Sequence, residues 1–190
     1  MGFRIQHVAT FLAFVFAACL APRHAQAQTY YAYVAAESDD EVALVRFDGE
    51  TAEVAETIPV GAWPTETEGP HGLTVAPDGA HWYLSIAHGQ PYGRVVKYAT
   101  ATNEPLAAVE VGMFPATMQI SEATGLLYVA NFNLHGKMEP STVSIVDPEA
   151  MQEVARVETG IMPHGSRLSP DGLRHYSVAM MSDSLRSEEH

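Results

Sequence analysis

Apolar and polar residues alternate with a period of two in many short stretches of the chain after residue 27. Examples are "HWYLSIA" (81–87), "GLLYVAN" (125–131) and "EVARVET" (153–159), which are rich in β-branched and aromatic residues. This pattern is typical of half-buried β-strands. No stretch after residue 27 keeps apolar residues at spacings of three and four over three turns, so few helices are expected. The pattern therefore predicts an all-β fold.

The predicted strands belong to a repeat. When the sequence is aligned with itself, three segments fall in register at offsets of 45 and 48 residues: "PHGLTVAPDGAHWYLSIA" (70–87), "PATMQISEATGLLYVANF" (115–132) and "PHGSRLSPDGLRHYSVAM" (163–180). A period of about 45 residues with about four short strands per repeat is typical of the blades of a β-propeller. We therefore expect a β-propeller of four-stranded antiparallel blades. Its units span residues 29–69, 70–114, 115–162 and 163–190.

The recurring phrase is explained as the opening of a blade. Its proline and glycine shape the start of the innermost strand, and "APDG" (76–79) or "SPDG" (169–172) ends that strand. In such a turn proline fixes φ and glycine adopts a positive φ, which suits a tight connection between two antiparallel strands.

The strand count predicts an incomplete ring. Thirteen strands are expected, with three in the first unit, four in each of the next two and two in the last. This is a partial propeller of about three and a half blades. Closure of a propeller removes exposed sheet edges, so we expect a fragment of a longer protein that self-associates through its open edges. Two copies would not form whole blades, because twice thirteen is not a multiple of four.

The motifs resemble the YVTN-type β-propeller repeat family, which includes the periplasmic YncE-like group. The resemblance is carried by "YVAN" (128–131), the weaker "YVAA" (33–36), the two PDG turns and the junction glycines Gly61, Gly112 and Gly160. It covers residues 29–183. The resemblance implies the propeller architecture and specifies no activity.

The N-terminal segment 1–27 is expected to be a secretory signal peptide. A short polar lead precedes an apolar run over 8–21, and residues 25–27, "AQA", are small at both positions that signal peptidase reads. The run is shorter than the roughly 20 residues of a membrane span, which makes an uncleaved anchor the lesser alternative. A lipid-bearing Cys19 in "FAAC" is the other alternative. The mature chain, 28–190, is then expected in the periplasm or outside the cell, without a membrane span.

Charge narrows the class of partner. The N-terminal segment holds two of the ten Lys and Arg residues and the only cysteine, so eight basic residues stand against 23 acidic ones in the mature chain. Nucleic acids and anionic membranes bind basic patches, and neither is expected as a partner. Because the mature chain has no thiol, its stability depends on core burial without disulfides.

Histidines and carboxylates are expected to gather on one face of the propeller. In a blade, the innermost strand begins on the face that also carries the loop between the second and third strands. This rule places six side chains near the mouth of the central channel: His71, His164, His88, His135, Glu66 and Glu68. Neutral imidazoles can bind copper, zinc or iron, and carboxylates can complete or orient such a shell. His71 and His164, from the two "PHG" phrases, are the predicted metal ligands.

Two functions are left open by these residues. The first is a binding or scaffold module whose small-molecule or protein partner occupies the channel mouth. The second is a metal-dependent periplasmic enzyme, an oxidoreductase or a lactonase, because the resemblance extends to propellers such as nitrous-oxide reductase and metal-dependent lactonases. Against the enzyme, Ala116 stands at the equivalent position of the third unit, and the chain has no HEXXH, CXXC or CXXCH motif.

A structural role for the histidines is the alternative to both functions. In that interpretation each imidazole uses its ring nitrogens to cap backbone groups at the start of a strand. No motif in the sequence specifies a cofactor.

Overall fold

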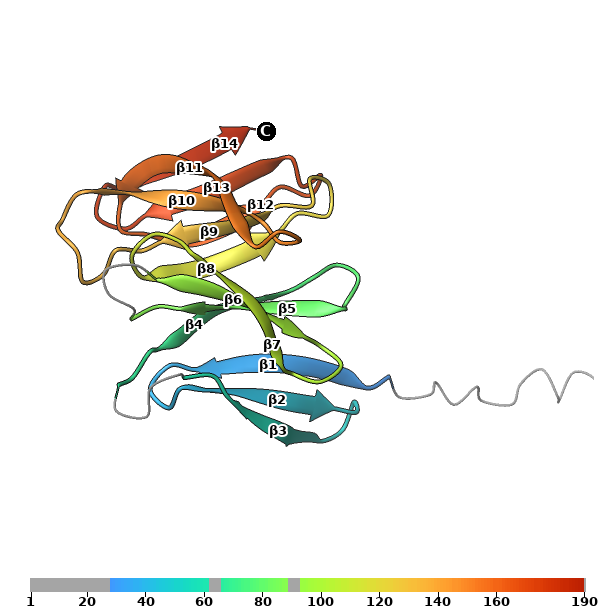
Figure 1. Cartoon of the computed structure of the whole chain (residues 1–190). Helices are drawn as coiled ribbons and strands as arrows, with labels where there is room; N and C mark the ends of the chain where they lie inside the picture. Colours follow the sequence, from blue (N-terminus) through green and yellow to red (C-terminus); the bar gives the residue numbers. More distant parts are fainter. Residues whose placement is uncertain (1–27, 62–65, 89–92, 190) are drawn as a thin grey trace, which may run out of the picture.

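The chain is all-β in the part that the computed structural model describes, residues 28–61, 66–88 and 93–189. Fourteen strands in these ranges form four antiparallel sheets, which we name blades 1 to 4 (Figure 1). No helix long and apolar enough to cross a membrane occurs among these residues. The predicted signal peptide and the alternative lipid site at Cys19 lie outside the described residues.

The strands of the four blades follow one another in chain order. Blade 1 holds β1 (Tyr30–Ala36), β2 (Glu41–Phe47) and β3 (Ala52–Pro59). Blade 2 holds β4 (Pro70–Val75), β5 (His81–Ile86), β6 (Arg94–Ala99) and β7 (Pro105–Glu110). Blade 3 holds β8 (Pro115–Ile120), β9 (Leu127–Asn131), β10 (Pro140–Asp147) and β11 (Gln152–Ile161). Blade 4 holds β12 (Pro163–Leu168), β13 (Arg174–Ala179) and β14 (Ser184–Glu189).

The blades stand side by side, as successive blades of a propeller do. Within each blade, strands that are neighbours in the chain pair antiparallel. The first strands of blades 2, 3 and 4 contact one another in order, β4 with β8 and β8 with β12, and β1 lies beside β4 (Figure 1). This arrangement confirms the predicted fold class, a partial β-propeller of antiparallel blades.

The predicted count of thirteen strands is wrong, because blade 4 has three strands and not two. Its third strand, β14, pairs with β13 over its whole length. The sequence of β14, "SLRSEE", contains a single apolar residue, so it carries no strand pattern of its own. Asp183 adopts a φ of 46° in the preceding turn, and the resulting hairpin brings β14 into backbone pairing. The strand count therefore no longer argues against the pairing of two copies.

The hydrophobic core lies between the blades. One cluster of apolar side chains fills each of the three contacts between neighbouring blades. The middle strands are covered on both faces, so all five residues of β9 and five of the six in β5 are buried. The outermost strands β3 and β7 are mostly exposed. Blades 2 and 3 therefore form a rigid frame for the loops and strand ends that they carry.

Candidate functional site

Blades 2, 3 and 4 open with the same backbone geometry. The residue before the first proline of each blade has a positive φ, at 67° for Gly69, 51° for Phe114 and 56° for Met162. Each of these residues accepts, through its carbonyl oxygen, a hydrogen bond of 2.8 to 3.0 Å from the amide that follows the second strand. For phenylalanine and methionine this conformation costs of order 1–3 kcal/mol, and such strain clusters at functional sites.

A β-bulge follows each of these prolines. The register of β4 against β5 shifts after Pro70, and the registers of β8 and β12 shift after the matching prolines. Bulges redirect side chains at sheet ends and beside active sites. In blades 2 and 4 the bulged residues include His71 and His164, which the two bulges bring together where the channel mouth is predicted.

His71 and His164 contact each other although β8 lies between their strands. Their Nε2 atoms are 3.2 Å apart, and their ring centroids are 5.4 Å apart with the planes nearly perpendicular. For a fixed distance between the two nitrogens, the ring centroids are farthest apart when each nitrogen points directly at the other. The observed centroid separation is close to that maximum, so the two nitrogens face each other almost head-on. β8 carries the small, buried Ala116 at the equivalent position. A small side chain there leaves room for the rings of His71 and His164 to meet.

Glu37 joins two of the imidazoles and was not among the predicted site residues. Its Oε2 lies 3.0 Å from Nδ1 of His71, and its Oε1 lies 2.8 Å from Nε2 of His88. Both ring nitrogens donate to the carboxylate, which fixes the His71 proton on Nδ1. Glu37 lies in the loop between β1 and β2. Blade 1 has no innermost strand among the described residues, so β1 and β2 correspond to the second and third strands of blades 2 and 3. The loop rule that predicts His88 and His135 at the mouth therefore also applies to Glu37.

The buried ring of Phe114 forms the floor of the cluster. Its centroid lies 5.4 Å from that of His71, 5.0 Å from His88 and 5.4 Å from His135, in edge-to-face contacts. Phe132 extends this floor to His164, at a centroid separation of 4.8 Å. Edge-to-face contacts of this kind stabilise aromatic clusters. The four predicted histidines therefore surround one apolar floor.

The two predicted glutamates have other surroundings. Glu68 is buried, and its Oε2 accepts a hydrogen bond of 2.6 Å from Arg94. The amides of Glu68 and Gly69 donate to the Asp40 carboxylate at 2.8 to 3.0 Å, which ties the start of blade 2 to blade 1. Glu66 is exposed in the same connection. Among the described residues, the hydrogen bonds and ion pairs of the four histidines involve Glu37 and neither of these carboxylates.

The structural alternative for His71 is contradicted by its contacts. Its two ring nitrogens face a carboxylate and an imidazole, so they do not cap backbone groups. Blade 4 is tied to blade 3 in another way, since the Thr117 hydroxyl donates to the carbonyl oxygen of His164 and contacts the Ser166 hydroxyl. The imidazole of His164 takes no part in this link and contacts His71.

The surroundings shift the pKa of two groups in the cluster. Burial, followed by the neighbouring charge of His71, lowers the pKa of His164, and Glu37 opposes this shift. Burial alone would raise the pKa of Glu37, but the hydrogen bonds from His88 and His71 outweigh it and lower that pKa. At neutral pH His164 is thus neutral and Glu37 is ionised.

Acidification is expected to destabilise the metal-free protein in two stages. Because the folded-state pKa of His164 lies below its ordinary value of 6.5, the unfolded chain binds more protons, and the free energy of unfolding falls as the pH drops below that value. The stability that Glu37 contributes is fully present above its unfolded pKa of 4.5 and is lost as the pH falls through its lower folded pKa. Urea denaturation at a series of pH values will measure both stages. His164→Gln should flatten the upper stage only, and an unchanged upper stage in this variant would contradict the assignment.

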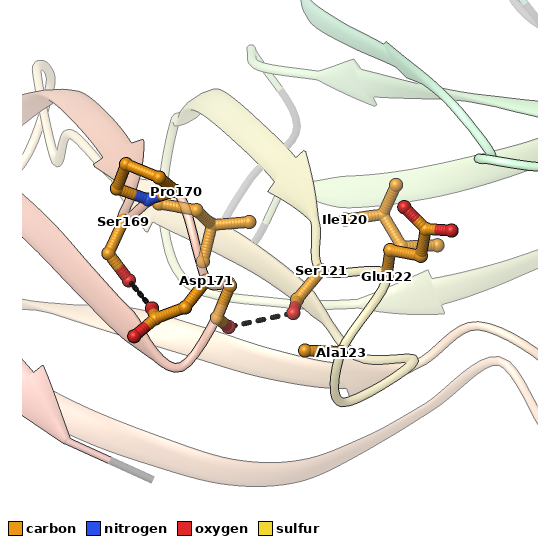
Figure 2. Close-up of a pocket in the computed structure, with 9 residues that line it drawn as sticks. Ile120, Ser121, Glu122, Ala123, Ser169, Pro170 and Asp171 are labelled. Atoms are coloured by element: carbon orange, nitrogen blue, oxygen red, sulfur yellow. Dashed lines mark hydrogen bonds between the residues drawn. The ribbon is translucent and has the colours of Figure 1, made fainter.

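Two cavities among the described residues lie away from the mouth. One, of about 380 Å³, lies between the turn after β8 and the turn between β12 and β13 (Figure 2). Its two carboxylates belong to Glu122 and Asp171, but Asp171 accepts hydrogen bonds from Ser169 and Leu173 of its own turn. The other cavity, of about 480 Å³, is a groove between blades 1 and 2 lined mainly by apolar residues and Arg94. Neither cavity therefore coincides with the histidine cluster. We take the cluster as the better candidate for a functional site, because its polar groups converge.

The cluster offers few side chains that could bind a metal ion. Over the described ranges, no three His, Cys, Asp or Glu side chains are arranged to hold one metal ion. The predicted ligands His71 and His164 are brought together as a pair.

Comparison with known proteins identifies the fold and no family. No protein-family model matches the sequence, and no curated protein does. The structure of Kuenenia stuttgartiensis hydrazine synthase is similar with a TM-score of 0.63 at 20% identity, over 80% of this chain and 44% of that chain. A candidate 6-phosphogluconolactonase of Bacteroides uniformis gives a TM-score of 0.67 at 19% identity, over 84% of this chain and 47% of that one. The chain thus spans less than half the length of either structure, and at this identity the likeness establishes a β-propeller fold.

Proposed function

We propose that the chain is an exported β-propeller module of the YVTN type that binds a small molecule or a protein segment at the channel mouth. One observation supports this proposal above the others, namely that all four blades contribute to a single cluster. The contributors are Glu37 from blade 1, His71 and His88 from blade 2, Phe114 and His135 from blade 3, and His164 from blade 4. Polar groups that converge from separate elements of a rigid frame are typical of ligand sites.

The exposure of the cluster also suits a ligand site. The side chains of His71 and His88 are 23% and 30% exposed, and that of Glu37 is 40% exposed, whereas Phe114 beneath them is buried. Ring edges and one carboxylate are therefore accessible above an apolar floor. Such a surface offers both stacking and hydrogen bonding, which suits a ligand with an apolar or aromatic body and a polar group.

The test is a fragment screen of the full chain read by NMR signals of the histidine side chains. The probes are small aromatic acids, small amines and neutral aromatic compounds. We expect probes that bind to shift the signals of the mouth histidines and to leave unchanged those of two histidines outside the cluster, His81 in β5 and His175 in β13. We expect His164→Ala to weaken their binding about tenfold or more, which equals about 1.4 kcal/mol. The proposal would be overturned if no probe shifts the NMR signals of the mouth histidines. It would also be overturned if the probes that bind shift only the signals of His175.

A metal-dependent enzyme of the lactonase or oxidoreductase type is the second candidate. It is favoured by the facing Nε2 atoms of His71 and His164, since imidazole nitrogens are common metal ligands. The test is hydrolysis of a simple aliphatic lactone, and reduction of a redox dye, by the full chain supplied with zinc or copper. Rates that equal those of the double variant His71→Ala, His164→Ala would remove this candidate.

A further inference from the structure

The facing Nε2 atoms of His71 and His164 can also serve the binding module itself, without any catalysis. We propose that Nε2 of His71 and Nε2 of His164 bind one divalent transition-metal ion, copper or zinc, and that Glu37 acts as the carboxylate that orients His71 for this role. The inference deepens the proposed function, on which it rests, because the ion would provide the anchor for a ligand at the channel mouth.

The separation of the two nitrogens fits a shared ion. Imidazole nitrogens lie about 2.0–2.1 Å from a tetrahedral zinc ion, which places two of them about 3.3 Å apart. The observed separation of Nε2 in His71 and Nε2 in His164 is 3.2 Å. Nε2 of His164 donates to Nε2 of His71 in the head-on contact, so metal binding requires the His164 proton to move to Nδ1. Each ring must also turn by roughly 35° before both lone pairs point to one tetrahedral ion. His71 and His164 come from blades 2 and 4, so the ion would link two blades that are not neighbours.

Glu37 prepares His71 to be a ligand. Its Oε2 accepts the Nδ1–H of His71 at 3.0 Å, which leaves a lone pair on the Nε2 that faces His164. A carboxylate on the far nitrogen of a ligating imidazole is a recurrent arrangement in metal sites, because it fixes the tautomer and raises the basicity of the ring. The second oxygen of Glu37 is itself held by His88 at 2.8 Å. This second contact keeps the carboxylate in place.

The two imidazoles leave coordination positions for a ligand. Within the described part of the chain, no third His, Cys, Asp or Glu is placed to complete the set, and the mouth is accessible, with the His71 side chain 23% exposed. Water or a donor atom of the bound molecule would fill the remaining positions, as in sites that keep an open position. The class of ligand expected at such a site is a small carboxylate or amino acid that can chelate the ion. Imidazole ligands favour copper and zinc over magnesium and calcium.

The test is calorimetric titration of the chelator-treated full chain with Cu²⁺, accompanied by electron paramagnetic resonance of the copper complex. We expect one copper ion per chain, with a spectrum that shows coupling to two imidazole nitrogens, and no binding of Mg²⁺ at the same concentrations. His71→Ala and His164→Ala should each remove one nitrogen from the spectrum and weaken binding at least tenfold. Glu37→Gln should weaken binding about 10–100-fold while both nitrogens remain in the spectrum.

The matched control is His81→Ala, which removes a histidine of β5 that lies outside the cluster. It should bind copper as the wild type does. Circular dichroism and thermal melting will show whether each variant folds, and His71→Asn replaces His71→Ala should the latter unfold. Equal affinity and equal spectra in wild type, His71→Asn and His164→Ala would overturn the inference. Fragment binding at the mouth without copper binding would refute the metal site alone, whereas copper binding without any fragment at the mouth would refute the proposed function alone.

Discussion

Alanine at position 72 is expected to destabilise the propeller strongly, whereas alanine at position 165 is expected to have little effect. Both glycines close the same phrase, "PHG", at the start of β4 and β12. A Cβ on Gly72 would overlap the backbone carbonyl oxygen of Ala116 and would approach the Ser85 hydroxyl to 3.1 Å. At Gly165 an added Cβ would meet no atom within 4 Å. The two substitutions are therefore chemically identical and differ in their surroundings.

The cost at Gly72 should be large because neither neighbour can move easily. The carbonyl oxygen of Ala116 belongs to the adjacent innermost strand, β8, and the amide of Gly72 donates a 2.6 Å hydrogen bond to Ser85. Relief of the overlap would push β4 away from β8 and break this bond. Overpacking of a well-packed interior costs about 1–3 kcal/mol and occasionally more, and a backbone overlap belongs at the upper end, about 3 kcal/mol. Gly165→Ala should stay within about 0.5 kcal/mol, as surface substitutions do.

Urea denaturation followed by circular dichroism will measure both variants under the same conditions. We expect the midpoint of Gly72→Ala to fall well below that of the wild type and the midpoint of Gly165→Ala to match it. Equal midpoints for the two variants would show that blades 2 and 3 are not in close contact at this point. Because His71 precedes Gly72, the Gly72→Ala variant should also disturb the His71 side-chain NMR signals.

The comparison of these two glycines shows what the sequence pattern can predict about the fold. The repeated phrase, the period-two stretches and the PDG turns predict the strands of blades 2 and 3, because those strands are apolar enough to carry a pattern. They do not predict β14, which is polar and is defined by its backbone pairing with β13. They also cannot distinguish Gly72 from Gly165, because β8 packs against Gly72 whereas no atom lies within 4 Å of the position that a Cβ on Gly165 would take.

The sequence also predicts only part of the candidate site, because repeat position can be deduced from the sequence and side-chain contacts cannot. The rule that the innermost strand and one loop of each blade share a face places the four histidines near one another. Nothing in residue type separates Glu37 from the many other carboxylates of an acidic chain, although the loop between β1 and β2 obeys the same rule. Glu68 lies in the connection before β4, but its carboxylate pairs with Arg94, and this ion pair depends on side-chain packing that residue type does not reveal.

Replacement of Trp82 by alanine is expected to cause a second large loss of stability. Trp82 is fully buried between blades 1 and 2, where its ring stacks on Tyr98 and Tyr33 at centroid separations of 4.0 and 4.7 Å. Its Nε1 donates to Oδ1 of Asn103 at 3.1 Å, and the Tyr33 hydroxyl donates to the same oxygen at 2.9 Å. Burial raises the pKa of Tyr98 to about 12, with opposing smaller effects of Arg94 and Glu68, which agrees with a dry stack.

Truncation of a buried tryptophan to alanine typically costs about 3–5 kcal/mol, because it removes apolar contact and leaves a cavity. Here it would also remove one of the two donors to Asn103, a residue that adopts a φ of 56° in the turn between β6 and β7. Trp82→Phe is the matched control, since it keeps an aromatic ring in the stack and removes the Nε1 donor. Its loss should be smaller, near the 0.5–1.5 kcal/mol of a typical hydrogen bond plus the cost of a smaller ring, about 1–2 kcal/mol in all. Urea denaturation will rank the three proteins, and a Trp82→Ala variant as stable as Trp82→Phe would mean that the aromatic stack does not hold blade 1 against blade 2.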